Sequence, residues 1–357
     1  MPSDPSPRLP TVTDVASLAQ VSRQTVSNVL NSPDVVAPHT RARVEHAIAR
    51  LGYRPHASAR RLRTRRSSTL GVRLDPVQNG ISGAVLDRFL HALTEQADAV
   101  GLRVTLYTAT DQQDEIRQFR RLVDGADVDA FVLTSTTVDD PRIDWLVEQG
   151  ADFVSFGRPW GRDLHDPARR WVDVDGRAGT AEVTAELLTR VGRRVAYLGW
   201  PAGSGVGDER RAGWAAVMAD VLPPAARARL DLHVEDSVGN AAAAVEALLT
   251  AGAIPDAVVC ASDTLALGAS MATGGRIPVV GFDDTPVAAA IGLSSVQQPV
   301  ARIATAALRL LGLVEDPSPP TGNHELVRPL VSWRDGGLRF VPADPEARAE
   351  GPTDPPR

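Results

Sequence analysis

The stretch Thr11-Val-Thr-Asp-Val-Ala-Ser-Leu-Ala-Gln-Val-Ser-Arg-Gln-Thr-Val-Ser-Asn-Val-Leu-Asn31 decides the fold of the N-terminal part of the chain. Thr11 and Asp14 predict a capping box that starts a first helix. Ser22 predicts a second N-cap, directly after a turn at Val21. Apolar residues recur at helical spacing in both segments, at Val15, Leu18, Ala19, Val26, Val29 and Leu30. The second helix then presents polar side chains outward, which is typical of a helix-turn-helix whose Arg, Gln and Asn residues read bases. The alternative is a small solvated helical hairpin.

A third helix is expected from His39 to Leu51, with Pro38 at its first position. Its inner face would carry Val44, Ala47, Ile48 and Leu51. The chain continues with Gly52-Tyr-Arg-Pro-His-Ala-Ser-Ala-Arg-Arg-Leu-Arg63.

Together these motifs resemble the LacI/GalR (lac repressor) family of bacterial transcription regulators. The family's Asp-Val-Ala, Val-Ser-x-x-Thr-Val-Ser-x-Val-Leu-Asn, Leu-Gly-Tyr-x-Pro and Ala-x-x-Leu stand here at 14–16, 21–31, 51–55 and 59–62. The match extends over about residues 11–66. It departs from the family at Ala37, where relatives often carry a Ser that caps the third helix.

The resemblance implies how the head would contact DNA. Arg23, Gln24 and Asn28 would read bases, whereas Thr25, Ser27 and Asn31 would contact phosphates. A hinge at 55–66 would fold as a helix only when two copies meet on DNA, and Leu62 would wedge into the minor groove. The full set of expected DNA-binding residues is Thr11, Ser22, Arg23, Gln24, Thr25, Ser27, Asn28, Asn31, Tyr53, Ala59, Leu62 and Arg63.

Charge is distributed unevenly between the head and the rest of the chain. Residues 1–66 contain 11 Arg and 4 acidic residues, a net charge of +7. The whole chain has a net charge of −6, so residues 67–357 carry −13. A basic head on an acidic body indicates that phosphate binding is confined to the head. Every basic residue is Arg, which favours forked contacts to phosphate and guanine.

From Ser68 onward, short apolar segments alternate with amphipathic ones, which predicts parallel sheets built from βαβ units. Strands are expected at 70–74, 103–107, 130–133, 152–156, 195–199, 257–261 and 278–281. Helices are expected at 83–100, 114–124, 177–191, 208–221, 240–251 and 264–273.

The resemblance implies that this α/β core has two lobes, like a periplasmic binding protein, and that the chain crosses between them three times. We expect lobe one at about 69–158 plus 299–323, and lobe two at about 159–298 plus 324–334. The domains would be a disordered leader at 1–10, the helix-turn-helix at 11–54, the hinge at 55–66, an effector-binding and dimerisation domain at 67–334, and a disordered tail at 335–357.

Several polar residues stand just after expected strands, where open α/β sheets bind ligands. Arg158 could clamp hydroxyls or a carboxylate, and Trp160 could stack on a sugar. The resemblance adds Arg210 in an Arg-x-x-Gly-aromatic motif, Asp283 in an Asp-Asp pair, Ser262 and Gln298. The two Arg could instead bridge the lobes, and Asp283 could cap a helix.

The resemblance therefore implies a cytoplasmic regulator, in most cases a repressor, that binds a palindromic operator as a dimer. A sugar is the expected effector, with a nucleobase or another metabolite as the alternative, and no cofactor is expected. A sugar-binding transport protein would carry a signal peptide in place of the Arg-rich head. A nucleotide-dependent enzyme would need a phosphate loop, and the cluster at 203–207 lacks the third glycine of that pattern. We expect this cluster to form a flexible loop at the rim of the cleft instead. An architectural DNA binder would not need so long a body.

Overall fold

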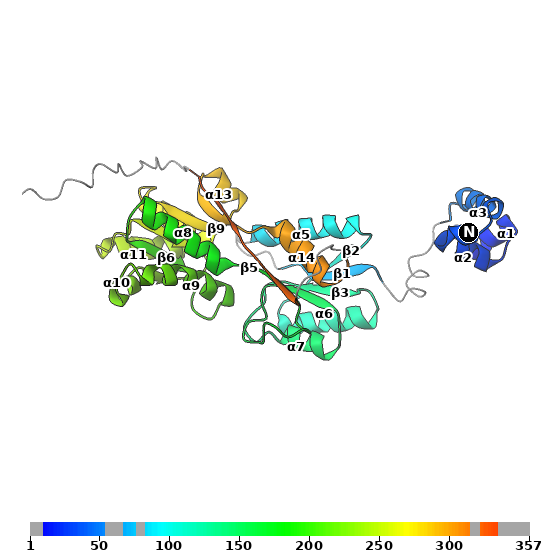
Figure 1. Ribbon diagram of the computed structural model, residues 1–357, viewed down its shortest axis with the longest axis horizontal. Coiled ribbons are helices and arrows are strands. Elements are labelled where there is room, and N and C mark those ends of the chain that lie inside the picture. Colours follow the sequence, from blue (N-terminus) through cyan, green and yellow to red (C-terminus); the bar gives the residue numbers. More distant parts are fainter. Residues whose placement is uncertain (1–9, 54–66, 76–82, 315–321, 335–357) are drawn as a thin grey trace, which may run out of the picture. The chain divides into compact units, whose positions relative to one another are not determined.

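Two separate units make up the chain, Met1–Ser67 and Ser68–Arg357. The computed structural model describes residues 10–53, 67–75, 83–314 and 322–334 (Figure 1). The predicted hinge helix at 55–66, the tail at 335–357 and all of the predicted leader except Pro10 lie outside the described residues.

The N-terminal unit is the expected helix-turn-helix. Its helices are α1 (Val12–Ala19), α2 (Arg23–Asn31), the 3-10 helix η1 (Pro33–Val35) and α3 (Pro38–Leu51). The backbone N–H of Thr11 donates to the Asp14 carboxylate at 2.7 Å, and the N–H of Asp14 donates to the Thr11 hydroxyl at 3.4 Å. The capping box is therefore confirmed, and so is the N-cap at Ser22, whose hydroxyl accepts from the Thr25 N–H at 3.0 Å.

The core of this unit brings together apolar residues of all three α-helices. It contains Val15, Ala16, Ala19, Val26, Val29, Val44, Ala47 and Tyr53. Leu18 was predicted on the buried face of α1, but it is 38% exposed. The structure buries Ala16 in its place, because the short α1 turns its 15–16–19 edge toward α3. Ala37 makes no side-chain cap to α3.

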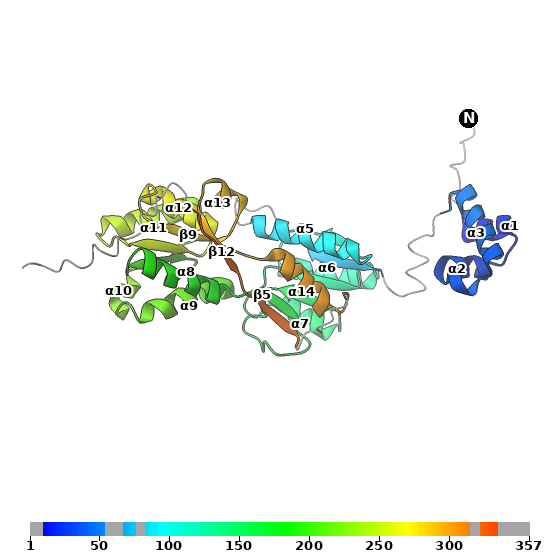
Figure 2. The ribbon, with the colours of Figure 1, turned by 45° about the horizontal axis from the view of Figure 1, so that its top comes forward.

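Lobe one of the second unit is built on a parallel six-stranded sheet with the order β11-β5-β4-β3-β1-β2. The strands are β1 (Thr69–Arg73), β2 (Arg103–Tyr107), β3 (Ala130–Leu133), β4 (Phe153–Phe156), β5 (Trp171–Val174) and β11 (His324–Val327). Its helices are α5 (Gly83–Ala99), α6 (Gln112–Asp124), α7 (Pro141–Glu148) and α14 (Val300–Leu310). Figures 1 and 2 both show α14 alongside α5, and α14 also contacts β4, β5 and β11.

Lobe two has a second six-stranded sheet with the order β12-β10-β9-β8-β6-β7. The strands are β6 (Val195–Gly199), β7 (Asp231–His233), β8 (Ala257–Cys260), β9 (Val279–Asp283), β10 (Ser294–Gln297) and β12 (Leu330–Ser332). The helices are α8 (Gly176–Arg190), α9 (Gly205–Ala219), α10 (Pro224–Ala228), α11 (Val238–Thr250), α12 (Asp263–Thr273) and α13 (Pro286–Ala290). Only β12 runs antiparallel among the described strand pairs, at the edge next to β10.

The three expected crossings between the lobes are present, but two lobe boundaries from the sequence are wrong. The first crossing follows β5 near Asp175, not residue 158, because β5 pairs with β4 in the first sheet. The third crossing follows β11, which pairs with β5, so 324–327 belongs to lobe one. The loop at 158–170, predicted as the break between lobes, instead joins two strands of one sheet.

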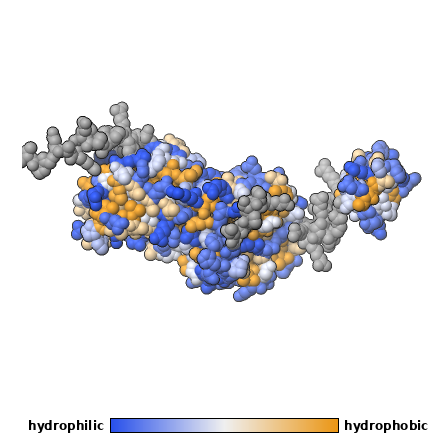
Figure 3. Space-filling model, in the orientation of Figure 1, coloured by the Kyte–Doolittle hydropathy of each residue, from blue (hydrophilic) through white to orange (hydrophobic). Residues whose placement is uncertain are grey.

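The glycine cluster at 203–207 is also not the flexible loop that the sequence indicated. Ser204 caps α9, and Gly205 to Gly207 form its first turn. On the surface, apolar residues are scattered between polar ones over the visible face of both lobes (Figure 3). Within the described ranges, no helix is long and apolar enough to span a membrane.

Candidate functional site

Helix α2 presents the polar face that the sequence predicted. Arg23 and Gln24 are exposed, whereas Val26 and Val29 are buried against the other helices. The Gln24 side-chain amide donates to the Asn28 side-chain oxygen at 3.0 Å, so these two groups lie one turn apart on the same face. This face carries the donors and acceptors that read guanine and adenine edges in a major groove.

The remaining predicted DNA contacts occupy mixed positions. Thr25 and Ser27 are half-buried, and Tyr53 is buried in the core of the head. Asn31 is the last residue of α2. Ala59, Leu62 and Arg63 lie outside the described residues.

Arg43 has a structural role that sequence reasoning missed. Its guanidinium donates to the carbonyl oxygens of Ala19 and Gln20, at 2.5 and 3.0 Å. These carbonyls belong to the last residue and the C-cap of α1, so Arg43 links α3 by hydrogen bonds to the turn between α1 and α2. Its only signal in the sequence was a basic residue on a helix surface, which is too common to single out.

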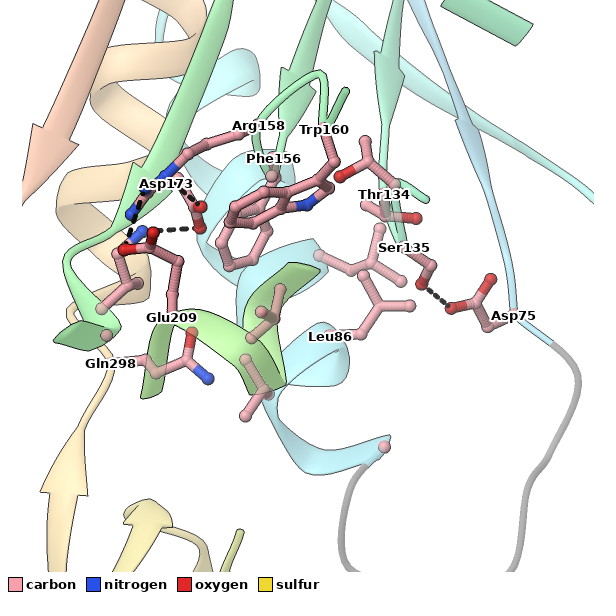
Figure 4. Close-up of a pocket in the computed structure, with 18 of the residues that line it drawn as sticks. Asp75, Leu86, Thr134, Ser135, Phe156, Arg158, Trp160, Asp173, Glu209 and Gln298 are labelled. Atoms are coloured by element: carbon pink, nitrogen blue, oxygen red, sulfur yellow. Dashed lines mark hydrogen bonds and ion pairs between the residues drawn. The ribbon is translucent and has the colours of Figure 1, made fainter. Parts of the chain in front are cut away.

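A cavity of about 550 Å³ lies between the lobes, and we call it the effector pocket (Figure 4). Lobe one lines it with residues that follow β1, β3 and β4 and with the first turns of α5. Lobe two contributes the first turns of α8 and α9, and Gln298 joins from the second crossing. Since β1 and β3 are neighbours at the point where the strand order reverses, the pocket stands at the switch point where open α/β sheets bind ligands.

Arg158 connects the two lobes at the pocket wall. Its Nε donates to Asp173 on β5 at 3.1 Å, and one terminal nitrogen lies 3.2 Å from Glu209 on α9 (Figure 4). Burial raises the pKa of Asp173 to about 6, although the Arg158 charge acts in the opposite direction. Arg158 is therefore an inter-lobe bridge, the alternative left open by the sequence, and it also faces the pocket.

Trp160 lines the pocket from the loop after β4 and packs on the start of α9. A Cβ atom added to Gly205 would lie 2.2 Å from the indole ring, so only glycine allows this approach. The Arg158 guanidinium lies 5.0 Å from the ring centroid of Trp160, within cation–π range. Figure 4 shows the indole nitrogen on the side of Thr134 and Ser135.

Arg210, Gln298 and Asp283 form a connected polar group in and behind the wall. The Gln298 amide donates to the Asp283 carboxylate at 2.6 Å, and Arg210 lies 3.6 Å from the same oxygen. Arg210 also donates to the Ala261 carbonyl at 2.5 Å and stacks 3.6 Å above the Phe282 ring. Arg210 and Gln298 line the pocket, whereas Asp283 stands behind them.

The conformation of Asp283 is unusual in two respects. Its φ is 108°, in a region that side-chain-bearing residues rarely adopt and that costs of order 1–3 kcal/mol. Burial raises its pKa to about 7, with Arg210 acting against the shift. Arg88 of lobe one donates to the carbonyls of Asp283 and Asp284, at 2.5 and 3.1 Å. Backbone strain, a perturbed carboxyl and an inter-lobe contact therefore coincide at one residue.

Ser262 does not line the pocket. Its hydroxyl accepts from the Leu265 N–H at 3.1 Å as the N-cap of α12 and donates to Asp236 at 2.6 Å. Of the six predicted effector residues, the structure brings Arg158, Trp160, Arg210 and Gln298 to the wall and places Asp283 and Ser262 behind it.

The wall also contains polar residues that the sequence did not indicate. Asp75 accepts from Arg73 at 2.7 Å and from the Ser135 hydroxyl at 2.8 Å. Thr134 follows β3, and Glu209 follows the first turn of α9. Asp75 and Thr134 were detectable only through their positions at strand ends, and Glu209 resembled an ordinary helix-surface residue.

Fold and site together define a protein with a helix-turn-helix head and a two-lobe domain whose cavity has the size of a small-molecule site. Two family models match the chain. Residues 11–56 match "Bacterial regulatory proteins, lacI family", and residues 86–298 match "Periplasmic binding proteins and sugar binding domain of LacI family".

Curated relatives and solved structures agree with these matches. CelR of Thermobifida fusca, an HTH-type transcriptional regulator, is 33% identical over 85% of this chain and 91% of its own. GalS of Salmonella typhimurium is 30% identical over 84% of this chain and 88% of its own. The solved structure of a CelR–cellobiose complex is similar to this chain with a TM-score of 0.63 and 27% identity, and the match covers 92% of this chain and 100% of that chain. The lac repressor dimer bound to operator has the same fold, with a TM-score of 0.73 at 22% identity over 93% of this chain and 100% of its own. The chain belongs to the LacI family of transcriptional regulators.

Proposed function

We propose that this regulator is a repressor that binds a palindromic operator as a dimer and is switched by a sugar in the effector pocket. The observation that carries the proposal is that groups of both lobes face one cavity, with Arg158 and Trp160 from lobe one and Arg210 from lobe two. A ligand there contacts both lobes at once and so favours one arrangement of the lobes over another.

A sugar fits the residues of the wall. Trp160 offers an aromatic surface for the apolar face of a sugar ring, and Gln298 and Arg210 offer hydrogen-bond donors for hydroxyls. The relative CelR has been solved with cellobiose. An inducer releases the operator and a co-repressor tightens it, and either behaviour follows from the same coupling between pocket and head.

The dimer follows from the geometry of DNA reading. One head with a single recognition helix reads one half-site, so a palindromic operator requires two heads related by a two-fold axis. The hinge with Leu62, outside the described residues, would kink the centre of the operator when two copies pair.

Selection of binding sites from random DNA by the full chain tests the proposal. We expect a palindrome, and we expect Arg23→Ala to lose about 1–3 kcal/mol on it and to relax one base position in each half-site. Arg41→Ala, an exposed residue of α3 paired with Glu45, is the matched control and should keep the base preference. A site without two-fold symmetry would contradict the dimer, and unchanged base preference in Arg23→Ala would contradict the base-reading role of α2.

A further inference from the structure

The polar atoms of the effector pocket fall into two groups that differ in charge. Of the four buried side-chain atoms of the described wall that lack a hydrogen-bond partner, one is Nε of Arg210 and the other three belong to neutral groups. They are Oγ1 of Thr134, Oγ1 of Thr136 and Nε1 of Trp160. A buried polar atom without a partner costs free energy, so these atoms are where a ligand gains most by hydrogen bonding.

The cations of the wall, in contrast, are already neutralised. Arg158 faces two carboxylates, Asp173 and Glu209, at 3.1 and 3.2 Å. Arg210 has Asp283 at 3.6 Å and the Phe282 ring beneath it. Its Nε lacks a partner, but the charge of a guanidinium is delocalised over the whole group, which faces Asp283.

Carboxylates outnumber guanidinium groups on the described wall. Asp75, Asp87, Asp173 and Glu209 line the pocket, against Arg158 and Arg210. Two further Arg lie beside the wall, but Arg73 is held by Asp75 and Glu115, and Arg88 by backbone carbonyls. The sequence of residues 76–82, which lie outside the part of the chain that the structure describes, contains no charged residue.

Two of the three helix ends at the pocket already have a negative partner. A helix N-terminus attracts anions, and those of α5, α8 and α9 reach the wall. The ends of α8 and α9 each have a carboxylate of their own, Asp175 as the N-cap of α8 and Asp208 in the first turn of α9, whereas α5 has none in its first turn and carries Asp87 one turn further on. Burial raises the pKa of both Asp173 and Asp283, so a charged group that loses its water in this region is destabilised.

We infer that the effector is an uncharged, hydroxyl-bearing molecule, and that the pocket rejects phosphorylated or carboxylated forms of the same compound. This inference rests on the proposed function, because it takes the pocket as the effector site. The free hydroxyls of Thr134 and Thr136 and the indole N–H of Trp160 pair with ligand hydroxyls. A phosphate or carboxylate meets excess negative charge, and both guanidinium groups of the described wall already face carboxylates.

A matched panel of compounds tests the inference on the full chain. Neutral mono- and disaccharides are screened by thermal shift, each beside its phosphate ester and its sugar acid, and calorimetry then gives the Kd of each hit. We expect at least one neutral sugar to bind and its charged counterparts to bind at least tenfold more weakly. A charged counterpart that binds as tightly or more tightly overturns the inference and leaves the proposed sugar effector standing. No binding by any compound of the panel contradicts the proposed function, and the inference falls with it.

A variant separates charge rejection from simple steric fit. Glu209→Gln removes one of the two carboxylates on Arg158, so the discrimination against charged counterparts should fall severalfold. Glu182→Gln, on the exposed face of α8 and paired with Arg328, is the matched control and should keep it. Equal discrimination in both variants and the wild type would show that size, and not charge, excludes the charged forms, and would overturn the inference.

Discussion

Replacing Arg142 by Met should destabilise the core domain by about 3 kcal/mol. Arg142 is fully buried, and its guanidinium donates to Asp140 at 2.6 and 2.9 Å, to Glu115 at 2.7 Å and to the Ser135 carbonyl at 3.0 Å. Breaking a buried ion pair costs about 3–5 kcal/mol, because the partner charge stays buried without compensation. Glu115 keeps Arg73 at 3.0 Å, so the low end of that range applies.

Urea unfolding followed by circular dichroism measures this change in the free energy of unfolding. Arg117→Met is the matched control, because the Arg117 side chain is 61% exposed and pairs with Asp114 at the surface, so its loss should cost less than about 1 kcal/mol. Adding Asp140→Asn to Arg142→Met should recover part of the loss, since Asn removes the unpaired charge and still caps α7. A cost for Arg142→Met no greater than that for Arg117→Met would refute the reasoning.

Three further predictions concern the pocket and the head. Gly205→Ala should weaken sugar binding by about 5- to 150-fold, because the added Cβ meets the Trp160 ring at 2.2 Å and overpacking costs about 1–3 kcal/mol; calorimetry measures the Kd. Asp283→Asn should gain stability relative to the wild type as pH rises from 4 to 8. The pKa of Asp283 in the folded protein is about 7, above its ordinary value of 3.8. The wild-type carboxyl therefore stabilises the folded state fully below pH 3.8, and this contribution, on the order of 4 kcal/mol, is lost as the pH rises through 7. Urea unfolding at each pH measures the free energy of unfolding. Thr11→Ala should speed amide hydrogen exchange in the head of the full chain, because a lost N-cap costs about 0.5–2 kcal/mol.

Controls decide each of these predictions. Gly239→Ala, at the start of α11 with open space around its Cβ position, should leave sugar binding unchanged. Equal sugar affinities for Gly205→Ala and Gly239→Ala would mean that the close approach of Trp160 to Gly205 is not required for binding. A constant stability difference between Asp283→Asn and the wild type over that pH range would show that Asp283 is ionised throughout. Thr13 is exposed on α1, so Thr13→Ala should leave the rate of amide hydrogen exchange unchanged. Equal exchange rates in Thr11→Ala and Thr13→Ala would show that the Thr11 cap does not stabilise the head.

The head could be predicted from the sequence almost in full, because its signals are local. N-caps at Thr11 and Ser22 and the proline that starts α3 act within one helical turn. Leu18 was misplaced because the apolar stripe of a helix as short as α1 does not show which of two edges is buried. The exposed positions of Arg23 and Gln24 could be predicted because they follow from the burial of Val26 and Val29 on the opposite face of α2.

The core was predicted only at the level of its class and lobes. Strands β5, β7, β10, β11 and β12 were missed because they are three or four residues long and several carry polar residues, as in Ser294-Ser-Val-Gln297. The lobe of β5 depends on its pairing with β4, and the lobe of β11 depends on its pairing with β5, which joins Trp171 to His324 far along the chain; composition encodes neither pairing. In the pocket, motifs identified Arg210 and Gln298. Thr134, Thr136 and Glu209 were missed because hydroxyl and acidic residues are common at strand ends and on helix surfaces.

The pairing of β11 with β5 has a consequence for how the protein is made. Lobe one begins with β1 near residue 69, yet its edge strand is at His324–Val327 and its covering helix α14 at Val300–Leu310. A ribosome therefore releases most of lobe two before the last pieces of lobe one exist. Until then the edge of β5 and the face of α5 have no covering partner, and unpaired strand edges are where incomplete chains aggregate. Lobe two, whose segments from α8 to β10 are continuous, is the part that can condense first during synthesis.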